Sequence, residues 1–157
     1  MRRVFRVAGF ALLAGPLVSC GGASPTRLAL TVSASAQLNP NTENQPSPTT
    51  ITIYDLKSSD IFMSASFDDL FYRGATTLGG DMLAQRQITM LPGQTTTLAD
   101  EAAAGTRFIG VVAGFRAAEG GEWRGLLAVR PEQRNRVAIT LAPSAVTVAR
   151  PPSGGLF

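Results

Sequence analysis

The sequence predicts an all-β fold, a two-sheet sandwich of about eight short strands with a small helical insertion. Segments in which apolar and polar residues alternate recur along most of the chain, and Gly, Pro, Asn and Ser separate them as turn signals. Helical spacing is concentrated in residues 59–78, which are followed by Gly79-Gly80. The 157 residues are enough for one domain with a core of its own.

The N-terminal end has the parts of a secretory signal. Arg2, Arg3 and Arg6 form a basic start, and residues 7–18 are uncharged and mostly apolar. As a helix, this apolar run would be about 18 Å long, which is too short to cross the ~30 Å hydrocarbon core of a membrane. We therefore expect residues 1–19 to be a signal peptide that is removed from the mature protein.

The signal closes on Leu17-Val18-Ser19-Cys20, which resembles the lipobox of bacterial lipoproteins. The resemblance implies that Cys20 carries a covalent lipid (diacylglyceryl, with palmitate as a typical acyl chain) and that residues 20–26 form a lipidated tether. Two or more acyl chains hold a protein firmly on a membrane. Gly21 stands where an Asp favours the inner membrane in enterobacteria, which implies an outer-membrane location facing the periplasm. The alternative is a free or buried cysteine after an ordinary signal.

Composition excludes several classes of function. Of the 14 basic residues, three lie in the signal, so 11 remain against 11 acids and a nucleic-acid role loses its main support. Without histidine, and with Cys20 as the single cysteine, the chain has no Ser-His-Asp or Cys-His set, no zinc motif and no internal disulfide. We expect no enzyme activity, no small-molecule substrate, and no metal or cofactor other than the lipid on Cys20. The adjacent acids Asp68-Asp69 are interpreted as charges at a helix N-terminus.

The first two strands are separated by a long connection. Residues 28–32 alternate as a half-buried strand, and residues 49–56 form a second strand with apolar side chains on both faces. Between them, residues 35–48 contain three prolines and little that is apolar except Leu38. Loops of this length without secondary structure are uncommon in compact domains, and they are usually functional or disordered. This connection is therefore the part of the mature chain that most suggests a functional site. We expect it to contribute little to the core.

The helical insertion has two start signals. Ser59 can cap a first turn, and Ser66 with Asp69 three residues later resembles a capping box. Aromatic and aliphatic residues in this insertion are interpreted as core contacts rather than a ligand site: Phe62, Phe67, Leu70 and Phe71. One more helical turn is expected over residues 81–84.

Six further strands complete the predicted sandwich. Residues 86–91 and 94–98 form a hairpin around Pro92-Gly93, and residues 100–105 a connection. Residues 107–115 are apolar on both faces, so we expect a central, buried strand. The remaining strands are expected over residues 122–130, 136–141 and 145–149, followed by a flexible tail over residues 150–157.

Several short motifs, taken in order, resemble the TssJ family, the outer-membrane lipoproteins of bacterial type VI secretion systems. These motifs are Leu38-Asn39-Pro40, Pro48 before Ile53-Tyr54-Asp55-Leu56, Phe62, Leu78-Gly79, Leu91-Pro92-Gly93, Gly110-Val111-Val112-Ala113 and Trp123-Arg124. Their order and spacing carry the resemblance, from the lipobox to about residue 142. It implies a transthyretin-like sandwich over residues 27–149, which docks the periplasmic C-terminal region of the inner-membrane protein TssM.

The resemblance also implies where the partner binds. In the family, the loop between the first two strands is implicated in the contact, and it corresponds here to residues 35–47. The residues expected to bind the partner are Gln37, Leu38, Asn39, Pro40, Asn41, Thr42, Glu43 and Asn44.

Three alternatives stay open. A lipoprotein that chaperones a secretin or binds the cell wall would have a similar sandwich, and an enzyme based on Asp/Glu pairs is a more distant alternative. Trp123 and Arg124 are residue types enriched at interface hot spots. Strand alternation instead favours a core Trp123 with Arg124 on the opposite, solvated face, and we expect the latter.

Overall fold

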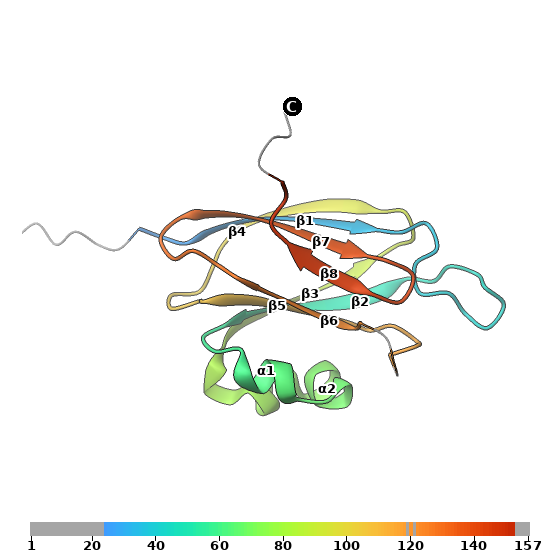
Figure 1. Ribbon diagram of the computed structural model, residues 1–157, viewed down its shortest axis with the longest axis horizontal. Helices are drawn as coiled ribbons and strands as arrows, with labels where there is room; N and C mark the ends of the chain where they lie inside the picture. Colours follow the sequence, from blue (N-terminus) through green and yellow to red (C-terminus); the bar gives the residue numbers. More distant parts are fainter. Residues whose placement is uncertain (1–23, 119, 121, 153–157) are drawn as a thin grey trace, which may run out of the picture.

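Two four-stranded sheets face each other in a computed structural model that describes residues 24–118, 120 and 122–152. The strands are β1 (Arg27–Ala34), β2 (Thr49–Leu56), β3 (Met82–Met90), β4 (Thr95–Glu101), β5 (Phe108–Ala113), β6 (Arg124–Ala128), β7 (Arg134–Leu141) and β8 (Val146–Ala149). The helices are α1 (Asp60–Ser64) and α2 (Phe67–Leu78), with a short 3-10 turn at Gly79–Asp81. The predicted sandwich of eight strands with a helical insertion is confirmed (Figure 1).

The two sheets differ in what lies on their outer faces. One sheet has the order β3-β2-β5-β6, and α1 and α2 lie against its outer face; we call it the covered sheet (Figure 1). The other has the order β4-β1-β7-β8 and no helix of the described residues lies on it; we call it the bare sheet. In the described part of the chain, no helix is long and apolar enough to cross a membrane.

The main core fills the space between the sheets. Leu28, Leu30 and Val32 of β1 are buried there and face inward-pointing side chains of the covered sheet, such as Ile53 and Val111. The expectation of a central strand over residues 107–115 is confirmed, because β5 pairs with β2 on one side and β6 on the other.

A second core lies under the helical insertion. Phe62, Leu70 and Leu78 are fully buried there with Tyr54 and Val112 of the covered sheet. The expected cap is confirmed: Ser66 is the N-cap of α2 and its side chain accepts a hydrogen bond from the Asp69 amide, at 3.2 Å.

Gly110 lets α1 approach the covered sheet closely. A Cβ atom at this position of β5 would lie 2.8 Å from the ring of Phe62, closer than such atoms approach each other in proteins. The missing side chain therefore makes the depression in which Phe62 is seated.

Two expected boundaries are wrong, for one physical reason. Residues 82–84 are the start of β3 and not a helical turn, because Met82 and Ala84 pair with the end of β2. Asp100 and Glu101 belong to β4 and not to a connection, because they pair with the start of β1. In both places pairing with a neighbouring strand overrides a weak local preference.

The two ends of the sandwich have different neighbours along the chain. β1 begins at the end that also carries residues 102–107 and 129–133; we call this end the tether pole. β1 ends about 25 Å away, at ~3.3 Å per residue, at the end that carries residues 35–48, 91–94, 114–123 and 142–145 (Figure 1). We call this second end the distal pole.

Candidate functional site

The base of the β1–β2 loop is built into the sandwich. Leu38 is fully buried in the main core, and Asn39 is 5% exposed. The Asn39 amide donates to the Pro143 carbonyl at 2.9 Å, and its side chain donates to the Pro48 carbonyl at 3.0 Å. The side-chain oxygen of Asn39 accepts from the Arg116 amide at 2.8 Å. We call Leu38 and Asn39 the loop base.

The loop base corrects one expectation from the sequence. The connection was expected to contribute little to the core, yet Leu38 fills part of it and Asn39 joins three segments of the distal pole. One leucine among prolines and asparagines gives no periodicity, so the pattern could not show that it points inward.

The outer part of the loop, residues 41–46, is closed on itself; we call it the loop tip. The Asn41 side-chain oxygen accepts from the amides of Glu43 and Gln45, both at 2.9 Å, and the Asn41 amide donates to the Gln45 carbonyl, also at 2.9 Å. Asn44 takes a left-handed φ of 58°, which asparagine tolerates better than most residues. Thr42, Glu43 and Asn44 are exposed on this preformed turn.

These observations divide the eight residues expected to bind the partner. Leu38 and Asn39 are buried in the protein itself, and Pro40 and Asn41 are half-buried beside them. The exposed members are Gln37, Thr42, Glu43 and Asn44. A partner could reach the second group directly, whereas the first holds the loop in place.

A cleft of about 940 Å³ lies beside the loop, between α2 and the β5–β6 connection. Its wall includes a group of aromatic side chains in mutual contact: Phe67 and Phe71 stack at 5.1 Å, and Trp123 meets Phe67 edge-on at 5.3 Å. Tyr72 borders the same cleft and is 72% exposed. We call it the aromatic cleft.

The loop and the aromatic cleft are physically joined. Arg116 lines the cleft, and its amide is the group that donates to Asn39 in the loop base. The loop base and the aromatic cleft are therefore joined through Arg116 on the distal pole. A weak signal for the cleft is present in the sequence, since Phe67 and Phe71 lie four residues apart on one side of a helix, but that spacing equally fits a core.

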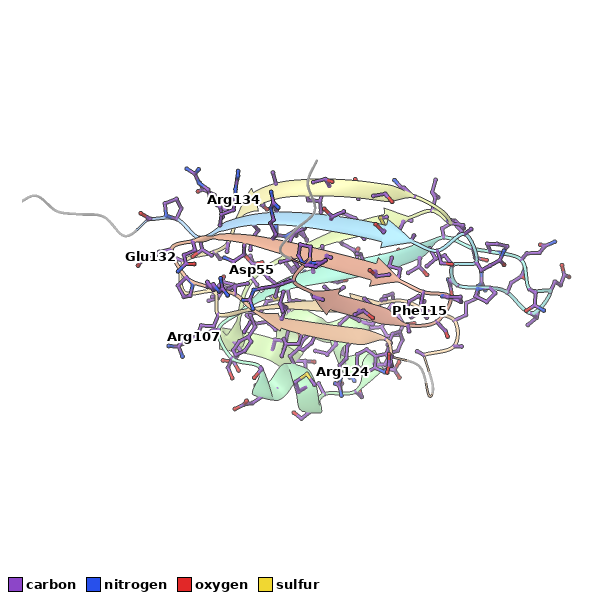
Figure 2. The ribbon with its side chains drawn as sticks, turned by 45° about the horizontal axis from the view of Figure 1, so that its top comes forward. Asp55, Arg107, Phe115, Arg124, Glu132 and Arg134 are labelled. Atoms are coloured by element: carbon purple, nitrogen blue, oxygen red, sulfur yellow. The ribbon has the colours of Figure 1, made fainter. Side chains whose placement is uncertain are left out.

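Arg124 is not on a solvated face, contrary to expectation. Its guanidinium donates to the carbonyls of Phe62 and Ala65, at 3.1 and 2.8 Å, and lies 4.7 Å from the centre of the Trp123 ring (Figure 2). These carbonyls are at the C-terminal end of α1, where a cation also complements the helix dipole. Strand alternation placed Arg124 on the outer face correctly, but the helical insertion covers that face.

The carboxylates of Asp69 and Asp55 have structural explanations. Asp69 lies in the first turn of α2, where hydrogen bonding from Ser66 and then the charge of Arg73 hold the pKa of its carboxyl below the usual range. Asp55 is fully buried and accepts from Arg86 at 2.6 Å, while Arg86 also reaches Asp100 of the opposite sheet at 2.6 Å. Among the described residues, no group of three or more acids, histidines or cysteines is placed to hold a metal ion.

The described chain is thus a two-sheet β-sandwich with an exposed, preformed loop and an aromatic cleft. The T6SS-SciN family, described as type VI secretion lipoprotein (VasD, EvfM, TssJ), matches residues 26–144. The chain belongs to this family of type VI secretion lipoproteins, which are structural proteins with no catalytic role.

Solved structures agree with the family match. The type VI secretion lipoprotein TssJ1 from Pseudomonas aeruginosa is 29% identical, with a TM-score of 0.78 over 83% of this chain and 99% of that chain. Serratia marcescens Lip, a membrane-bound component of the type VI secretion system, is 28% identical, with a TM-score of 0.73 over 80% of this chain and 99% of that chain.

A more distant likeness shows the shared fold alone. It is to a chain from a structure of the TssM C-terminal domain (869–1107) from EAEC, at 23% identity and a TM-score of 0.63 over 81% of this chain and 98% of that chain. A comparison with the curated proteins finds no match.

Cys20 and the signal peptide expected over residues 1–19 lie outside the described residues. Family membership makes the chain a type VI secretion lipoprotein, while the lipid site itself remains the prediction made from Leu17-Val18-Ser19-Cys20.

Proposed function

We propose that this lipoprotein is held in the outer membrane by a lipid on Cys20 and docks the periplasmic C-terminal region of TssM through the loop tip. The observation that supports this most is the placement of the loop. The lipid tether leads into the start of β1, and the loop follows the end of the same strand, at the opposite pole. The docking residues are therefore presented away from the anchoring membrane, toward an inner-membrane partner.

The loop is also suited to binding by its preformed shape. The hydrogen bonds that the Asn41 side chain accepts from the Glu43 and Gln45 amides fix the turn before any partner arrives, so little conformational freedom is lost on association. Proline at positions 40, 46 and 48 restricts the backbone further. The chemistry of the tip is polar with one acid, Glu43, which favours hydrogen bonding over apolar burial.

The test replaces residues 41–46 with a short Gly-Ser link and leaves the loop base untouched. Because Ser47 still donates to the Leu38 carbonyl, which it meets at 2.9 Å, the base stays closed and the melting temperature should change little. Binding to the TssM periplasmic region should weaken at least about tenfold, as expected when interface hot spots are lost. Titration calorimetry and circular-dichroism melting give the two readings.

A matched control changes exposed residues on the bare sheet, with Thr31→Ala and Thr97→Ala in one chain. This control should bind and melt as the wild type does. Unchanged affinity in the loop-tip variant would reject the loop as the docking element. The aromatic cleft would then be the next surface to test, with Tyr72→Ala, because Tyr72 is exposed and its removal leaves the core intact.

The anchor has its own test. Cys20→Ser should leave the precursor without lipid, keep the chain out of the outer-membrane fraction and abolish type VI secretion. Metabolic labelling with radioactive palmitate and membrane fractionation measure this outcome. Label in the Cys20→Ser chain would show that the lipid is elsewhere.

A further inference from the structure

Three arginines lie together on the outer face of the bare sheet, next to the point where the tether enters. Arg27 opens β1, and Arg134 and Arg136 lie near the start of β7, which runs parallel to β1. Arg27 is the register partner of Arg134, and Ala29 is the partner of Arg136. All three side chains are exposed, and Figure 2 shows Arg134 at this end of the sandwich. We call these three residues the arginine corner.

The three arginines of the corner form no ion pair within the described part of the chain. Among the described residues, the carboxylate contacts within 4.0 Å of an arginine involve Arg73 and Arg86, and none involves this corner. Glu101 is the register partner of Arg27 on the other side and is the acid nearest in the sheet. Placing two cations directly opposite each other on neighbouring strands is unfavourable, so the corner is a site where an external anion would be stabilising.

The tether fixes this corner close to the membrane. Thr26 is held at the tether pole from two sides, because its carbonyl accepts from the Ala102 amide and its hydroxyl accepts from the Glu132 amide, both at 2.8 Å. The chain from Cys20 to Thr26 therefore spans at most about 20 Å when fully extended. A body on so short a tether samples the headgroup layer at high effective concentration.

We propose that the arginine corner binds the phosphates of anionic phospholipid headgroups in the membrane that holds the lipid anchor. The guanidinium group suits this role, since its fork of N–H donors matches phosphate oxygens. Basic groups are attracted to an anionic bilayer surface over roughly one Debye length, about 8–10 Å. The corner at the tether pole would then lie against the membrane, and the distal pole with its loop tip would still point away from it.

The rest of the surface agrees with this orientation. The outward positions of β1 and β7 beyond the corner carry only small or uncharged side chains, such as Ala29, Thr31, Ala138 and Thr140, so nothing bulky holds the corner off a flat surface. The covered sheet cannot approach a membrane in this way, because α1 and α2 lie on its outer face.

The proposal rests on the Cys20 anchor of the proposed function. The experiment therefore measures membrane anchoring and the protection of the arginine corner separately. The full lipidated chain is reconstituted into vesicles of phosphatidylethanolamine with phosphatidylglycerol, and into vesicles of phosphatidylcholine alone. Flotation reports the anchor. Phenylglyoxal labelling, followed by mass spectrometry, then reports how accessible each arginine is.

The expected result is selective protection of the corner. In the anionic vesicles, labelling of Arg27, Arg134 and Arg136 should slow at least about threefold relative to phosphatidylcholine, and high salt should restore it. Arg116, at the distal pole, should label equally in both. Equal labelling of the corner in the two vesicle types would overturn the proposal while leaving the anchor standing, and failure to float would overturn both.

Matched variants extend the test. In the double variant Arg134→Gln/Arg136→Gln, Arg27 is the one cation left in the arginine corner. The membrane attracts this single charge more weakly, so Arg27 should lose its protection in anionic vesicles. Arg73→Gln/Arg116→Gln removes the same charge from other parts of the surface and should leave Arg27 protected. Protection of Arg27 that persists in the first variant, or that is lost in both, would overturn the proposal.

Discussion

The outer faces of the two sheets are used in opposite ways. On the covered sheet, outward side chains such as Tyr54, Leu56 and Val112 are buried beneath the helical insertion. On the bare sheet, the outward positions of β1 carry Arg27 and Thr31, which are exposed. The two sheets have the same number of strands and share the core between them. Only the covered sheet has a second core, on its outer face.

The difference teaches how to interpret the strand patterns. A strand with one solvated face alternates, as β1 and β7 do, whereas a strand covered on both faces is buried along nearly its whole length, as β2 and β5 are. In this protein, a strand that is covered on both faces belongs to the sheet under the helices, and it is also one of the two central strands of that sheet.

The largest expected effect compares neighbouring residues on the two sheets. Val111→Asp and Val112→Asp should each cost about 4 kcal/mol or more, because either places an unpaired carboxylate in a core. With a total stability of ~5–15 kcal/mol, both variants should melt far below the wild type or fail to fold. On β1, Leu30→Asp should do the same, whereas Thr31→Asp should stay within about 0.5 kcal/mol. Urea unfolding measures all four, and a tolerated Val112→Asp would contradict a second core.

An intermediate effect is expected where the covered sheet holds α2. The buried hydroxyl of Tyr54 donates to the Leu70 carbonyl at 2.7 Å, and burial raises the pKa of this phenol. Tyr54→Phe leaves that carbonyl without its donor and should cost about 1–3 kcal/mol. Thermal unfolding gives the loss, and Tyr72→Phe, at an exposed position of the same helix, is the control that should change nothing.

The smallest effect concerns the start of α2 and depends on pH. Because the folded-state pKa of Asp69 is lowered from 3.8, its stabilising effect is complete above about that pH and is lost as the pH falls through the folded value. Asp69→Asn should therefore be less stable than the wild type at neutral pH, and the difference should vanish in strong acid. A difference in melting temperature that is the same at both pH values would contradict this account.

Much of the fold could be predicted because its strands carry strong local patterns. The alternation in β1 and β7, the apolar β5 and the Ser66 cap all act within a few residues, so they are visible in the sequence. The predictions were wrong where contacts with residues far along the chain determine the structure. Met82 joins β3 through pairing with Leu56, and Arg124 is covered by a helix some 60 residues earlier in the chain.

The candidate site was predictable only in part, for a similar reason. The length and prolines of the loop indicated a presented segment, but the inward direction of Leu38 and the contacts of Asn39 depend on the whole distal pole. The aromatic cleft brings α2 against the β5–β6 connection, and no periodicity within either segment could reveal their proximity.

The position of β1 has a mechanical consequence. Any pull between the membrane tether and the β1–β2 loop enters at one end of this strand and leaves at the other. β1 is an inner strand, paired with β4 over seven positions and with β7 over eight. Since these hydrogen bonds lie across the direction of the pull, the load is shared among them as shear and they do not open one after another, as in a zipper. The strand thus resists tension along its length as a single unit.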